Sequence, residues 1–344
     1  MPFTLVPEYS PVRAVVLALP YRGGDWDASY NAAMRCYRGM VETLLREDAG
    51  VEVWLLAKAG ADLIEWQSGL TLPAGAARRL LILTDIDYDD TWIRDYGPLT
   101  LAAANGDIEF KSFTFNGWGG KYLATNDNQV AAQLAPYLGQ SVTELAYVLE
   151  GGALEVNTAG VLLVNADCVV DEQRNAKLDR AAMQDVLQAE LGVSEVEWVA
   201  DIALTGDDTD GHIDTIARFV ADDIIVACDR NAAHHDAAAL DALNTQLEAI
   251  CRRRGWQLVR LPVPVVHSAV DGRLLPATYA NFLLCNGILF VPIYDQPEDA
   301  AALRILKEAL PMYRTVGIRC EALLEQHGSL HCATMQIPEV PGDI

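Results

Sequence analysis

The sequence predicts an α/β fold built from a repeated unit of strand, turn, strand, helix and strand. In each unit two apolar runs flank a short turn signal, and a helix-like stretch and another short apolar run follow. The unit recurs about every sixty residues, and four copies are visible. A doubly wound parallel sheet is the alternative, but tight hairpins are antiparallel and fit that architecture poorly.

The paired apolar runs predict four hairpins. Asn-Gly between strands is a strong hairpin signal and occurs at Asn105-Gly106 and Asn286-Gly287. Ala159-Gly160 and Asp222-Asp223 are weaker signals. The four hairpins are expected at residues 99–113, 153–164, 213–227 and 281–292.

A helix-like stretch follows each hairpin and leads to a further strand. Helices are expected, for example, at residues 176–191 and 233–253, and strands at 196–199, 257–261 and 314–318.

The two ends of the chain supply the parts of a fifth unit. Residues 332–337 would form its first strand and 12–19 its second, followed by a helix at 29–47 and a strand at 51–56. Termini that complete one unit together close a ring, which a linear array cannot do. We therefore expect a single catalytic domain over residues 1–344, with the last repeat completed by both termini.

The composition favours a soluble protein. With 51% hydrophobic residues the chain can bury a substantial core, and no apolar run reaches the length of a membrane span. The first residues lack the features of an export signal. A net charge of −23 argues against a nucleic-acid partner. It would favour encounter with a cationic small molecule, although solubility alone also explains such a charge.

The seven cysteines show no CxxC spacing, so neither a zinc ribbon nor a disulfide framework is predicted. Several of them, such as Cys228 and Cys285, stand in apolar runs, as core residues do. We expect a reducing, cytoplasmic location. The oligomeric state is left open, with a homodimer as one option.

Cys332 is the candidate nucleophile. It ends the segment Gly328-Ser329-Leu330-His331-Cys332, and a cysteine becomes nucleophilic when an imidazole or a cationic substrate lowers the pKa of its thiol. For an isolated cysteine, a buried structural role is the alternative. On a strand His331 would point to the opposite face, so no catalytic role is predicted for it.

His212 and Asp214 stand two residues apart in Gly211-His212-Ile213-Asp214. On a strand both side chains would point to the same face. A histidine beside a carboxylate can act as a general acid or base near neutral pH. The alternative is a structural histidine at a strand end with a solvated aspartate.

Asp95 belongs to a segment that begins at Trp92 and contains Arg94. A guanidinium is a planar cation with donors along its edges, which carboxylates bind bidentately, while an indole can cover its plane. Asp95 and Trp92 are thus of the residue types that can bind a planar cation. The alternative is a structural ion pair between Arg94 and Asp95, with Trp92 in the core.

Taken together, these segments resemble the agmatine deiminase and peptidylarginine-deiminase-like family of guanidine-modifying enzymes, from about residue 80 to the end. The agmatine-type pattern ends in glycines, Asn, an aliphatic residue, His and Cys. This chain departs from it at Gln326, His327 and Ser329. The resemblance implies a five-bladed, pseudo-symmetric α/β propeller (the pentein fold) of ββαβ repeats.

The resemblance also implies a reaction, the hydrolytic deimination of agmatine to N-carbamoylputrescine and ammonia, without a metal or an organic cofactor. Cys332 would attack the guanidinium carbon and form an amidino-cysteine intermediate. His212 would serve as acid and base, and Asp95 and Asp214 would clamp the guanidinium. The rivals are deimination of peptidyl arginine or another guanidine, transfer of the amidino group to an amine, and non-catalytic guanidine binding.

Further residues are candidates for substrate binding. Glu150 and Gly151 open a glycine pair that would let the backbone approach a ligand, although a tight turn explains the pair nearly as well. Asp90 and Asp208, with their neighbours Asp89 and Asp207, could receive a distant ammonium group.

Two more segments enter the prediction. His327, His331 and Cys332 could be mistaken for zinc ligands, but no second ligand cluster accompanies them, and no metal site is predicted. Typical agmatine deiminases have Pro-Ala-Glu-Trp near the N-terminus, where this chain has Pro7-Glu8-Tyr9. We expect the segment 7–20 to shape the pocket at the far end of the substrate.

Overall fold

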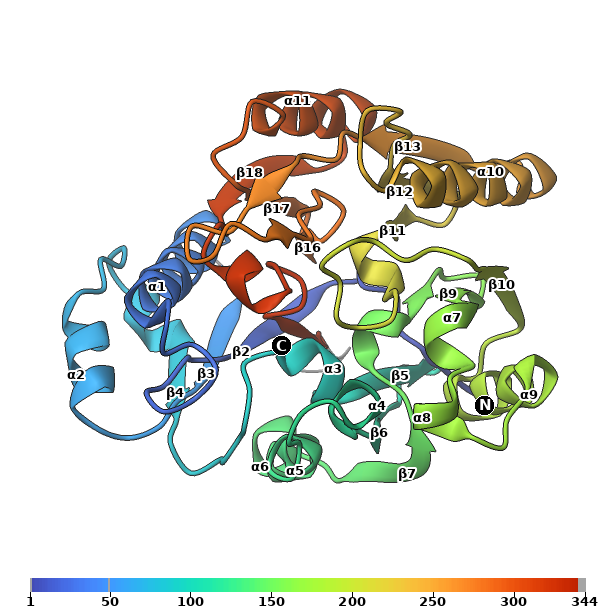
Figure 1. The fold of residues 1–344 in the computed structure, drawn as a ribbon. Coiled ribbons are helices and arrows are strands. Elements are labelled where there is room, and N and C mark those ends of the chain that lie inside the picture. Colours follow the sequence, from blue (N-terminus) through green and yellow to red (C-terminus); the bar gives the residue numbers. More distant parts are fainter. Residues whose placement is uncertain (1, 49, 340–344) are drawn as a thin grey trace.

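The computed structural model describes residues 2–48 and 50–339. Its strands form five sheets of three or four strands each and one two-stranded ribbon. Figure 1 shows the five sheets grouped around the middle of the molecule, with the long helices on the outside. The chain has the α/β architecture that the sequence predicts.

Three sheets share one topology, in which an antiparallel hairpin is followed by a helix and by a third strand parallel to the second. These units are β8 (Glu155–Val156), β9 (Val161–Asn165), α9 (Arg180–Leu191) and β10 (Glu195–Val199); β11 (Ala217–Ala221), β12 (Ile224–Cys228), α10 (Ala237–Arg254) and β13 (Gln257–Leu261); and β16 (Leu283–Cys285), β17 (Ile288–Ile293), α11 (Asp299–Ala309) and β18 (Arg314–Arg319). The hairpins predicted within residues 153–164, 213–227 and 281–292 are confirmed.

Local chemistry explains where these elements turn and begin. In the hairpin of β16 and β17, Asn286 and Gly287 have φ of 47° and 77°, as the primed turns of tight hairpins require. Helix α9 begins four residues later than predicted because the Asp179 side chain accepts a hydrogen bond from the Ala182 N–H and caps the helix.

A four-stranded sheet contains the hairpin predicted at residues 99–113. Its second strand pairs in parallel with a later strand, and a short N-terminal strand that the sequence analysis missed adds an antiparallel edge. The strands are β1 (Phe3–Leu5), β5 (Leu99–Ala103), β6 (Ile108–Thr114) and β7 (Val142–Val148). Short helices flank them: α3 (Ile93–Tyr96), α4 (Gly117–Gly120), α5 (Asp127–Gln133) and α6 (Ala135–Leu138).

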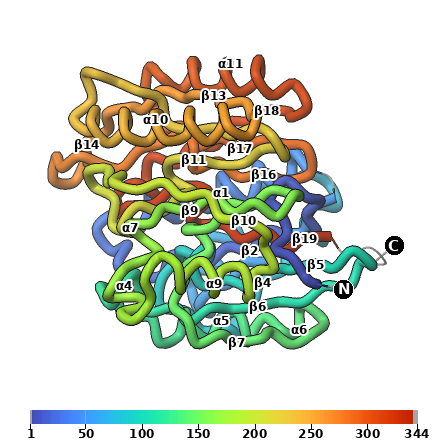
Figure 2. The backbone as a smooth tube through the Cα atoms, turned by 90° about the vertical axis from the view of Figure 1, so that its right-hand side faces the viewer, coloured from blue at the N-terminus to red at the C-terminus, as the bar shows by residue number. Residues whose placement is uncertain are grey.

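The fifth sheet joins the two ends of the chain. The strand β19 (Met335–Pro338) pairs antiparallel with β2 (Val12–Ala18), and Figure 2 shows these two strands close together. Two parallel strands complete the sheet. They are β3 (Glu52–Leu56), which the sequence predicts, and β4 (Leu80–Leu83), which it does not. In the chain, α1 (Tyr30–Glu47) lies between β2 and β3, and α2 (Ala61–Ser68) lies between β3 and β4.

Burial explains why these segments fold as they do. Helix α1 buries residues spaced three and four apart, among them Tyr37, Val41 and Leu44. All five residues of β9 are buried, as expected for a strand covered on both faces. The shorter elements are α7 (Ala166–Val169), α8 (Glu172–Asn175), β14 (Val266–His267), β15 (Leu274–Leu275) and 3-10 helices at Ala76–Arg79, Gly151–Ala153, Ile213–Thr215 and Leu323–Gln326.

Candidate active site

Cys332 lies in a turn just before β19. The sequence prediction that it starts a strand is wrong, because the chain turns through residues 330–333 and the strand begins only at Met335. Its side chain is 5% exposed and lines a pocket. Because His331 and Cys332 lie in this turn and not on a strand, the expectation that their side chains point to opposite faces of a strand is also wrong.

His212 and Asp214 stand at a 3-10 helix, Ile213–Thr215, rather than on the predicted strand, because β11 begins only at Ala217. Both side chains are fully buried. Among the described residues, no hydrogen-bond partner is found for either ring nitrogen of His212 or for Oδ1 of Asp214. Buried polar atoms are rarely left unpaired, so these atoms are suited to meet a ligand.

Asp95 comes from α3 and is held by two donors. Its Oδ1 accepts from the Gly152 N–H at 2.9 Å, and its Oδ2 accepts from the Trp118 indole N–H at 2.9 Å. The distance from Oδ1 to Nδ1 of His212 is 3.6 Å. The structural alternative, an ion pair between Arg94 and Asp95, does not form; Arg94 pairs with Glu8 instead.

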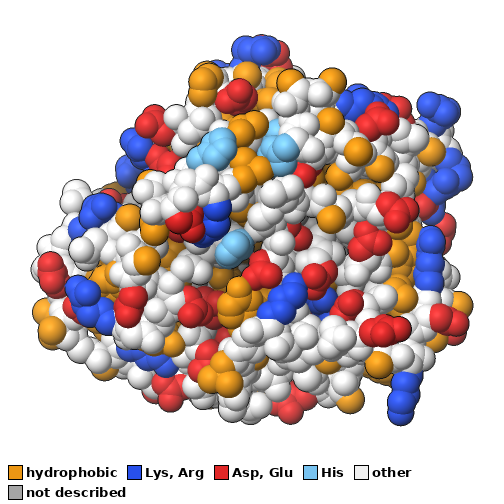
Figure 3. Space-filling model, in the orientation of Figure 1, with side chains coloured by type: hydrophobic (Ala, Val, Ile, Leu, Met, Phe, Trp, Pro, Cys, Tyr) orange, Lys and Arg blue, Asp and Glu red, His pale blue; other side chains and the backbone are white. Residues whose placement is uncertain are grey.

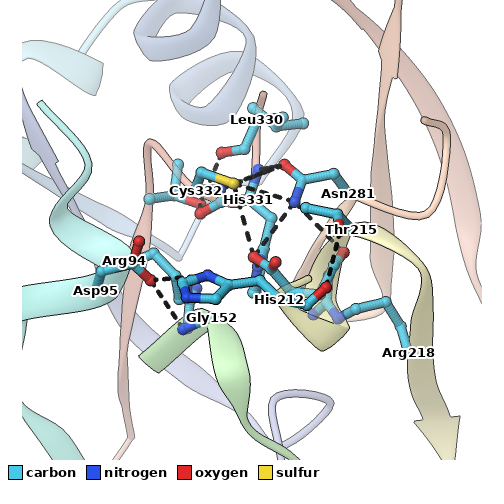
Figure 4. Close-up of polar contacts among 12 residues, drawn as sticks. Arg94, Asp95, Gly152, His212, Thr215, Arg218, Asn281, Leu330, His331 and Cys332 are labelled. Carbon is cyan, nitrogen blue, oxygen red and sulfur yellow. Dashed lines mark hydrogen bonds and ion pairs between the residues drawn. The ribbon is translucent and has the colours of Figure 1, made fainter. Parts of the chain in front are cut away.

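The side chains of Asp95, His212 and Asp214 converge at Gly152, and Figure 4 shows the first two beside it. A Cβ at Gly152 would lie 2.6 Å from Nδ1 of His212, 2.8 Å from Oδ1 of Asp95 and 3.2 Å from Oδ2 of Asp214. Only glycine lets the backbone come so close. Segments that are distant in the sequence are thus brought together in one cluster.

Glu150 and Gly151 do not line the pocket. Both carboxylate oxygens of the fully buried Glu150 accept from Nε of Arg174, at 2.8 and 3.0 Å. A Cβ at Gly151 would come within 2.2 Å of the Arg94 carbonyl oxygen, so this glycine serves close backbone packing. The Glu150 carboxylate lies 4.0 Å from Nε2 of His212.

Asp214 is the end of a buried hydrogen-bonded chain. Nδ1 of His331 lies 2.7 Å from Oδ2 of Asp214, and its Nε2 lies 2.7 Å from Glu8. A neutral imidazole carries one N–H and can donate to only one of the two carboxylates. Both contacts are hydrogen bonds only when a second proton is present, on the imidazole or on one of the two carboxyl groups. His331 therefore fixes the Asp214 carboxylate in place, a role that the sequence analysis did not foresee.

The N-terminal segment lies behind the site rather than at its opening. None of residues 7–20 lines the pocket, so the expectation for this segment is wrong. Glu8 instead contacts Arg94 at 2.8 Å and Arg218 at 2.5 Å. Both arginine side chains are buried, and neither lines the pocket, so neither is placed to pair with a ligand there.

Burial sets the ionisation of the site. The pKa of Asp95 lies well above its usual value because of burial and the nearby charges of Asp214 and Glu150. The pKa of Asp214 is lowered: burial opposes this, but the hydrogen bond from His331 and the surrounding cations outweigh it. Two carboxyls so close do not readily ionise together, and a bound cation would relieve their repulsion.

The pKa shifts of Cys332, the candidate nucleophile, and His212, the candidate base, both favour the neutral form. Burial raises the pKa of the Cys332 thiol well above its usual value, and Asp214 and Asp95 add to the effect. Burial lowers the pKa of His212 to about 3. A cation placed between the carboxylates would favour the thiolate.

Aromatic side chains form part of the pocket wall. Trp92 lines it, as predicted, and so do Trp118 and Tyr122, which the sequence analysis missed. Trp118 has a φ of 55° and lies between glycines at 117 and 119, both of which have positive φ. The cluster Gly117-Trp118-Gly119-Gly120 was a readable signal, because glycines permit the backbone that turns this indole toward Asp95.

The pocket is also acidic. Asp90, Asp95 and Asp208 line it, together with Asp25, for which the sequence gave no signal. No Lys or Arg is among its lining residues in the described part of the chain. Figure 3 shows acidic side chains spread over this face of the molecule.

The other two aspartates proposed to receive a distant ammonium have structural roles. Asp89 holds Asn126, accepting from its backbone N–H at 2.7 Å. Asp207 accepts from the Gly211 N–H at 2.7 Å and shapes the turn that leads to His212.

The altered loop at residues 326–329 completes the pocket. Gln326, His327 and Gly328 line it, and a Cβ at Gly328 would lie 2.4 Å from the Trp92 ring. Ser329, where the family has Asn, lies 2.8 Å from the hydroxyl of Tyr294 and is buried. Gly328 therefore allows the loop to pack against Trp92, and Ser329 contacts Tyr294 in the protein core.

The motif of His327, His331 and Cys332, for which no metal site is predicted, does not bring its side chains together around one point. His331 contacts two carboxylates, and His327 contacts the Gly206 carbonyl oxygen at 2.8 Å, so these two do not form a site with Cys332. Two other groups of described side chains have atoms close enough to share an ion: Glu150, Cys168 and His212, and residues 234–236.

Across the described residues, no helix has the length and apolar character that crossing a membrane demands.

Comparisons with known proteins identify the family. A family model described as Porphyromonas-type peptidyl-arginine deiminase matches residues 4–338. A relative from Vibrio parahaemolyticus serotype O3:K6, named "Putative agmatine deiminase", is 30% identical over 96% of this chain and 95% of its own length.

Two solved structures are similar over nearly the whole chain. An agmatine deiminase of C. jejuni with substrate bound has a TM-score of 0.89 and 29% identity, covering 98% of this chain and 97% of that one. A Porphyromonas gingivalis protein named "Putative Arginine Deiminase" has a TM-score of 0.87 and 36% identity, covering 98% and 99%. Because the family model spans nearly all of its length, the chain belongs to the Porphyromonas-type peptidyl-arginine deiminase family.

Proposed function

We propose that this protein hydrolyses the guanidinium group of agmatine to give N-carbamoylputrescine and ammonia, through an amidino-cysteine intermediate. The observation that carries the proposal is the convergence of Asp95, His212 and Asp214 at Gly152, beside a pocket that Cys332 lines. Agmatine deiminases are among the similar proteins, one of them solved with substrate bound, and this supports the assignment.

We also propose that the five sheets are the blades of one α/β propeller and form a single catalytic domain. The pairing of β19 with β2, which would complete the fifth blade from both termini, supports this arrangement. A reducing, cytoplasmic setting would suit a chain whose cysteines, Cys332 included, are free.

Substrate binding in this proposal begins with charge. The guanidinium lies between Asp95 and Asp214, where its N–H groups supply the partner that Oδ1 of Asp214 lacks. Trp92 and Trp118 flank the cation with their rings. The positive charge lowers the pKa of the Cys332 thiol, whose proton passes to the neutral His212.

The first half-reaction then removes ammonia. The Cys332 thiolate attacks the guanidinium carbon and forms a carbon–sulfur bond. The proton that His212 received is transferred to one terminal nitrogen, the carbon–nitrogen bond breaks, and ammonia departs. A positively charged amidino group remains on Cys332, still held by the two carboxylates.

The second half-reaction releases the enzyme. His212, neutral again, takes a proton from a water molecule whose oxygen attacks the amidino carbon. The carbon–sulfur bond breaks, and His212 returns its proton to the departing Cys332 sulfur. The remaining oxygen-bound proton is released to solvent as the product leaves with a neutral urea group. All groups in both steps come from this chain, the substrate and water, so no cofactor is invoked.

The pocket favours agmatine over free arginine. Agmatine ends in an ammonium, which Asp25, Asp90 and Asp208 can receive. Burial raises the pKa of Asp90 to about 7, and a bound ammonium would favour its ionised form. The α-carboxylate of arginine would meet these acids with no Lys or Arg of the described lining to pair with it.

Ammonia release from agmatine, arginine, an arginyl peptide and other small guanidines tests the proposal. We expect kcat/KM for agmatine to exceed that for arginine by at least about a hundredfold, because a buried unpaired carboxylate costs several kcal/mol. Equal or better use of arginine, or activity confined to peptides, would reject agmatine as the substrate. Amidinated acceptor in place of ammonia would identify an amidinotransferase, and no reaction with any guanidine would leave a binding protein.

A further inference from the structure

We propose that Cys36 and Cys320 are a redox-sensitive pair, which forms a disulfide by exchange with a small peptide disulfide and thereby displaces the loop at the active-site pocket. Cys36 lies in α1 and is partly exposed, whereas Cys320 directly follows β18 and is fully buried. Both thiols are free. Formation of the disulfide does not depend on the proposed function, and only its effect on ammonia release rests on that function.

Contacts between α1 and the end of β18 bring the two cysteines together. The Cys36 thiol donates to the Arg319 carbonyl oxygen at 3.1 Å, and this oxygen belongs to the peptide bond that joins Arg319 to Cys320. Burial raises the pKa of the Cys320 thiol well above its usual value, and a hydrogen bond with the Cys36 side chain adds to the effect. The two thiols therefore contact each other, although they lie far apart in the sequence.

A groove gives access to one of the two thiols. It has a volume of about 760 Å³ and lies between α1 and the segment 317–325. Cys36 lines this groove, and Cys320 is not among the described residues that do. Arg35, Arg319 and Glu321 give the groove charges of both signs, which suit a peptide disulfide that carries carboxylates and ammonium groups. Such a reagent would reach Cys36 first.

The exchange takes place in two steps that consume one molecule of the peptide disulfide. The Cys36 thiolate attacks one sulfur of the reagent, the S–S bond of the reagent breaks, and one peptide thiol leaves with the proton from Cys36. The Cys320 thiolate then attacks the Cys36 sulfur, the mixed disulfide breaks, and the second peptide thiol leaves with the proton from Cys320. The two cysteines are oxidised, and the reagent is reduced to two thiols. Contact between the thiols offsets the small thiolate fraction that the raised pKa of Cys320 allows.

A short helix connects Cys320 to the active-site pocket. The Cys320 carbonyl oxygen accepts from the Leu323 N–H at 3.0 Å, where the 3-10 helix Leu323–Gln326 begins. Gln326 and the next residue, His327, line the pocket. A disulfide holds its sulfurs about 2 Å apart, closer than two thiols in contact, so the two segments must move toward each other when the bond forms. We expect this movement to displace Gln326 and His327 and to slow ammonia release.

Oxidised glutathione is the peptide disulfide that tests the pair. After incubation the remaining thiols are alkylated with iodoacetamide, and unreduced peptides are identified by mass. In the wild type we expect a peptide that links Cys36 to Cys320, with no glutathione on either. Cys320→Ser should stop at the mixed disulfide on Cys36, and Cys36→Ser should leave Cys320 unmodified. Cys251, a buried cysteine of α10, provides the matched control, and Cys251→Ser should form the link as the wild type does.

The same samples test the effect on the pocket. We expect ammonia release from agmatine to fall at least about tenfold in the linked wild type, because small displacements at an active site have large effects on rate, and to return with dithiothreitol. Cys36→Ser should keep its activity with and without oxidised glutathione. Circular dichroism checks that each variant is folded, and Cys320→Ala replaces Cys320→Ser if the core does not tolerate the serine.

Other results would overturn the inference. A wild type that stays unmodified at both cysteines, or that keeps glutathione on Cys36, lacks the proposed pair. Glutathione on Cys332, with equal loss of activity in Cys36→Ser, would place the reactive thiol in the active site instead. A linked protein with full ammonia release would contradict the effect on the loop. Because the link is detected without substrate, a wild type that forms it but does not deiminate agmatine would overturn the proposed function and leave the disulfide established.

Discussion

Replacing Cys332 with Ala is expected to abolish ammonia release from agmatine without unfolding the protein. The proposed adduct requires a sulfur nucleophile, and no other cysteine lines the pocket in the described chain. Loss of a covalent nucleophile removes the reaction path itself, so turnover should fall by at least about ten-thousandfold. Steady-state ammonia release, with a thermal melt for each variant, measures this.

A cysteine outside the site provides the control. Cys36 is partly exposed on α1 and should tolerate Ala with activity unchanged. Appreciable turnover by purified Cys332→Ala would eliminate the covalent route and leave His212 to activate water directly. Loss of activity in both variants would indicate a general effect on the protein rather than on the nucleophile.

The second large effect is expected for Asp95→Asn and Asp214→Asn. Each should lower kcat/KM for agmatine by at least about a hundredfold, about 2.7 kcal/mol of transition-state stabilisation, because a charge-assisted hydrogen bond to the guanidinium is lost. In the wild type the two Asp95 oxygens accept from the Gly152 N–H and the Trp118 indole N–H. The asparagine amide has only one oxygen, so in Asp95→Asn one of these two donors loses its acceptor.

The two aspartates differ in what their loss should reveal. Asp214→Asn breaks the contact with His331, so it should also change the pH dependence of Cys332 alkylation. The exposed Asp87, which pairs with Lys58, is a suitable control, and its Asn variant should keep full activity. If both active-site variants retained near-normal kcat/KM, the guanidinium would be bound by other groups, with Asp208 the next to test.

Much of the fold was predictable because its signals are local. Turn residues such as Asn286-Gly287 sit between apolar runs, and every predicted hairpin is present. The pairing of β19 with β2 followed from counting strands in the repeated unit. The edge strand β1 and the strand β4 were missed because three or four residues carry too little pattern to be told from a loop.

The chemistry of the site was predictable in residue type but not in local geometry. Cys332, His212 and Asp214 stand in segments with family-like signatures, yet none lies on a strand as expected. Turns and 3-10 helices leave no periodic trace in a sequence, so their presence at the functional residues could not be foreseen.

Residues that act through long-range contacts could not be foreseen either. Asn281 and Glu8 reach the site across separations of 51 and 323 residues, to Cys332 and His331 respectively. Such partners depend on how whole sheets are placed, which local patterns do not encode. Trp118 is the exception, because the glycines around it marked an unusual backbone.

The central claim is that a guanidinium carbon becomes bonded to Cys332 during turnover. Acid quenching of the wild-type protein at saturating agmatine, followed by mass measurement of the peptide that contains Cys332, tests this claim directly. The account predicts a peptide heavier by the mass of agmatine less ammonia, absent without substrate and absent in Cys332→Ala. Steady ammonia release with the Cys332 peptide unmodified at every quench time, or with the added mass on another residue, would contradict it.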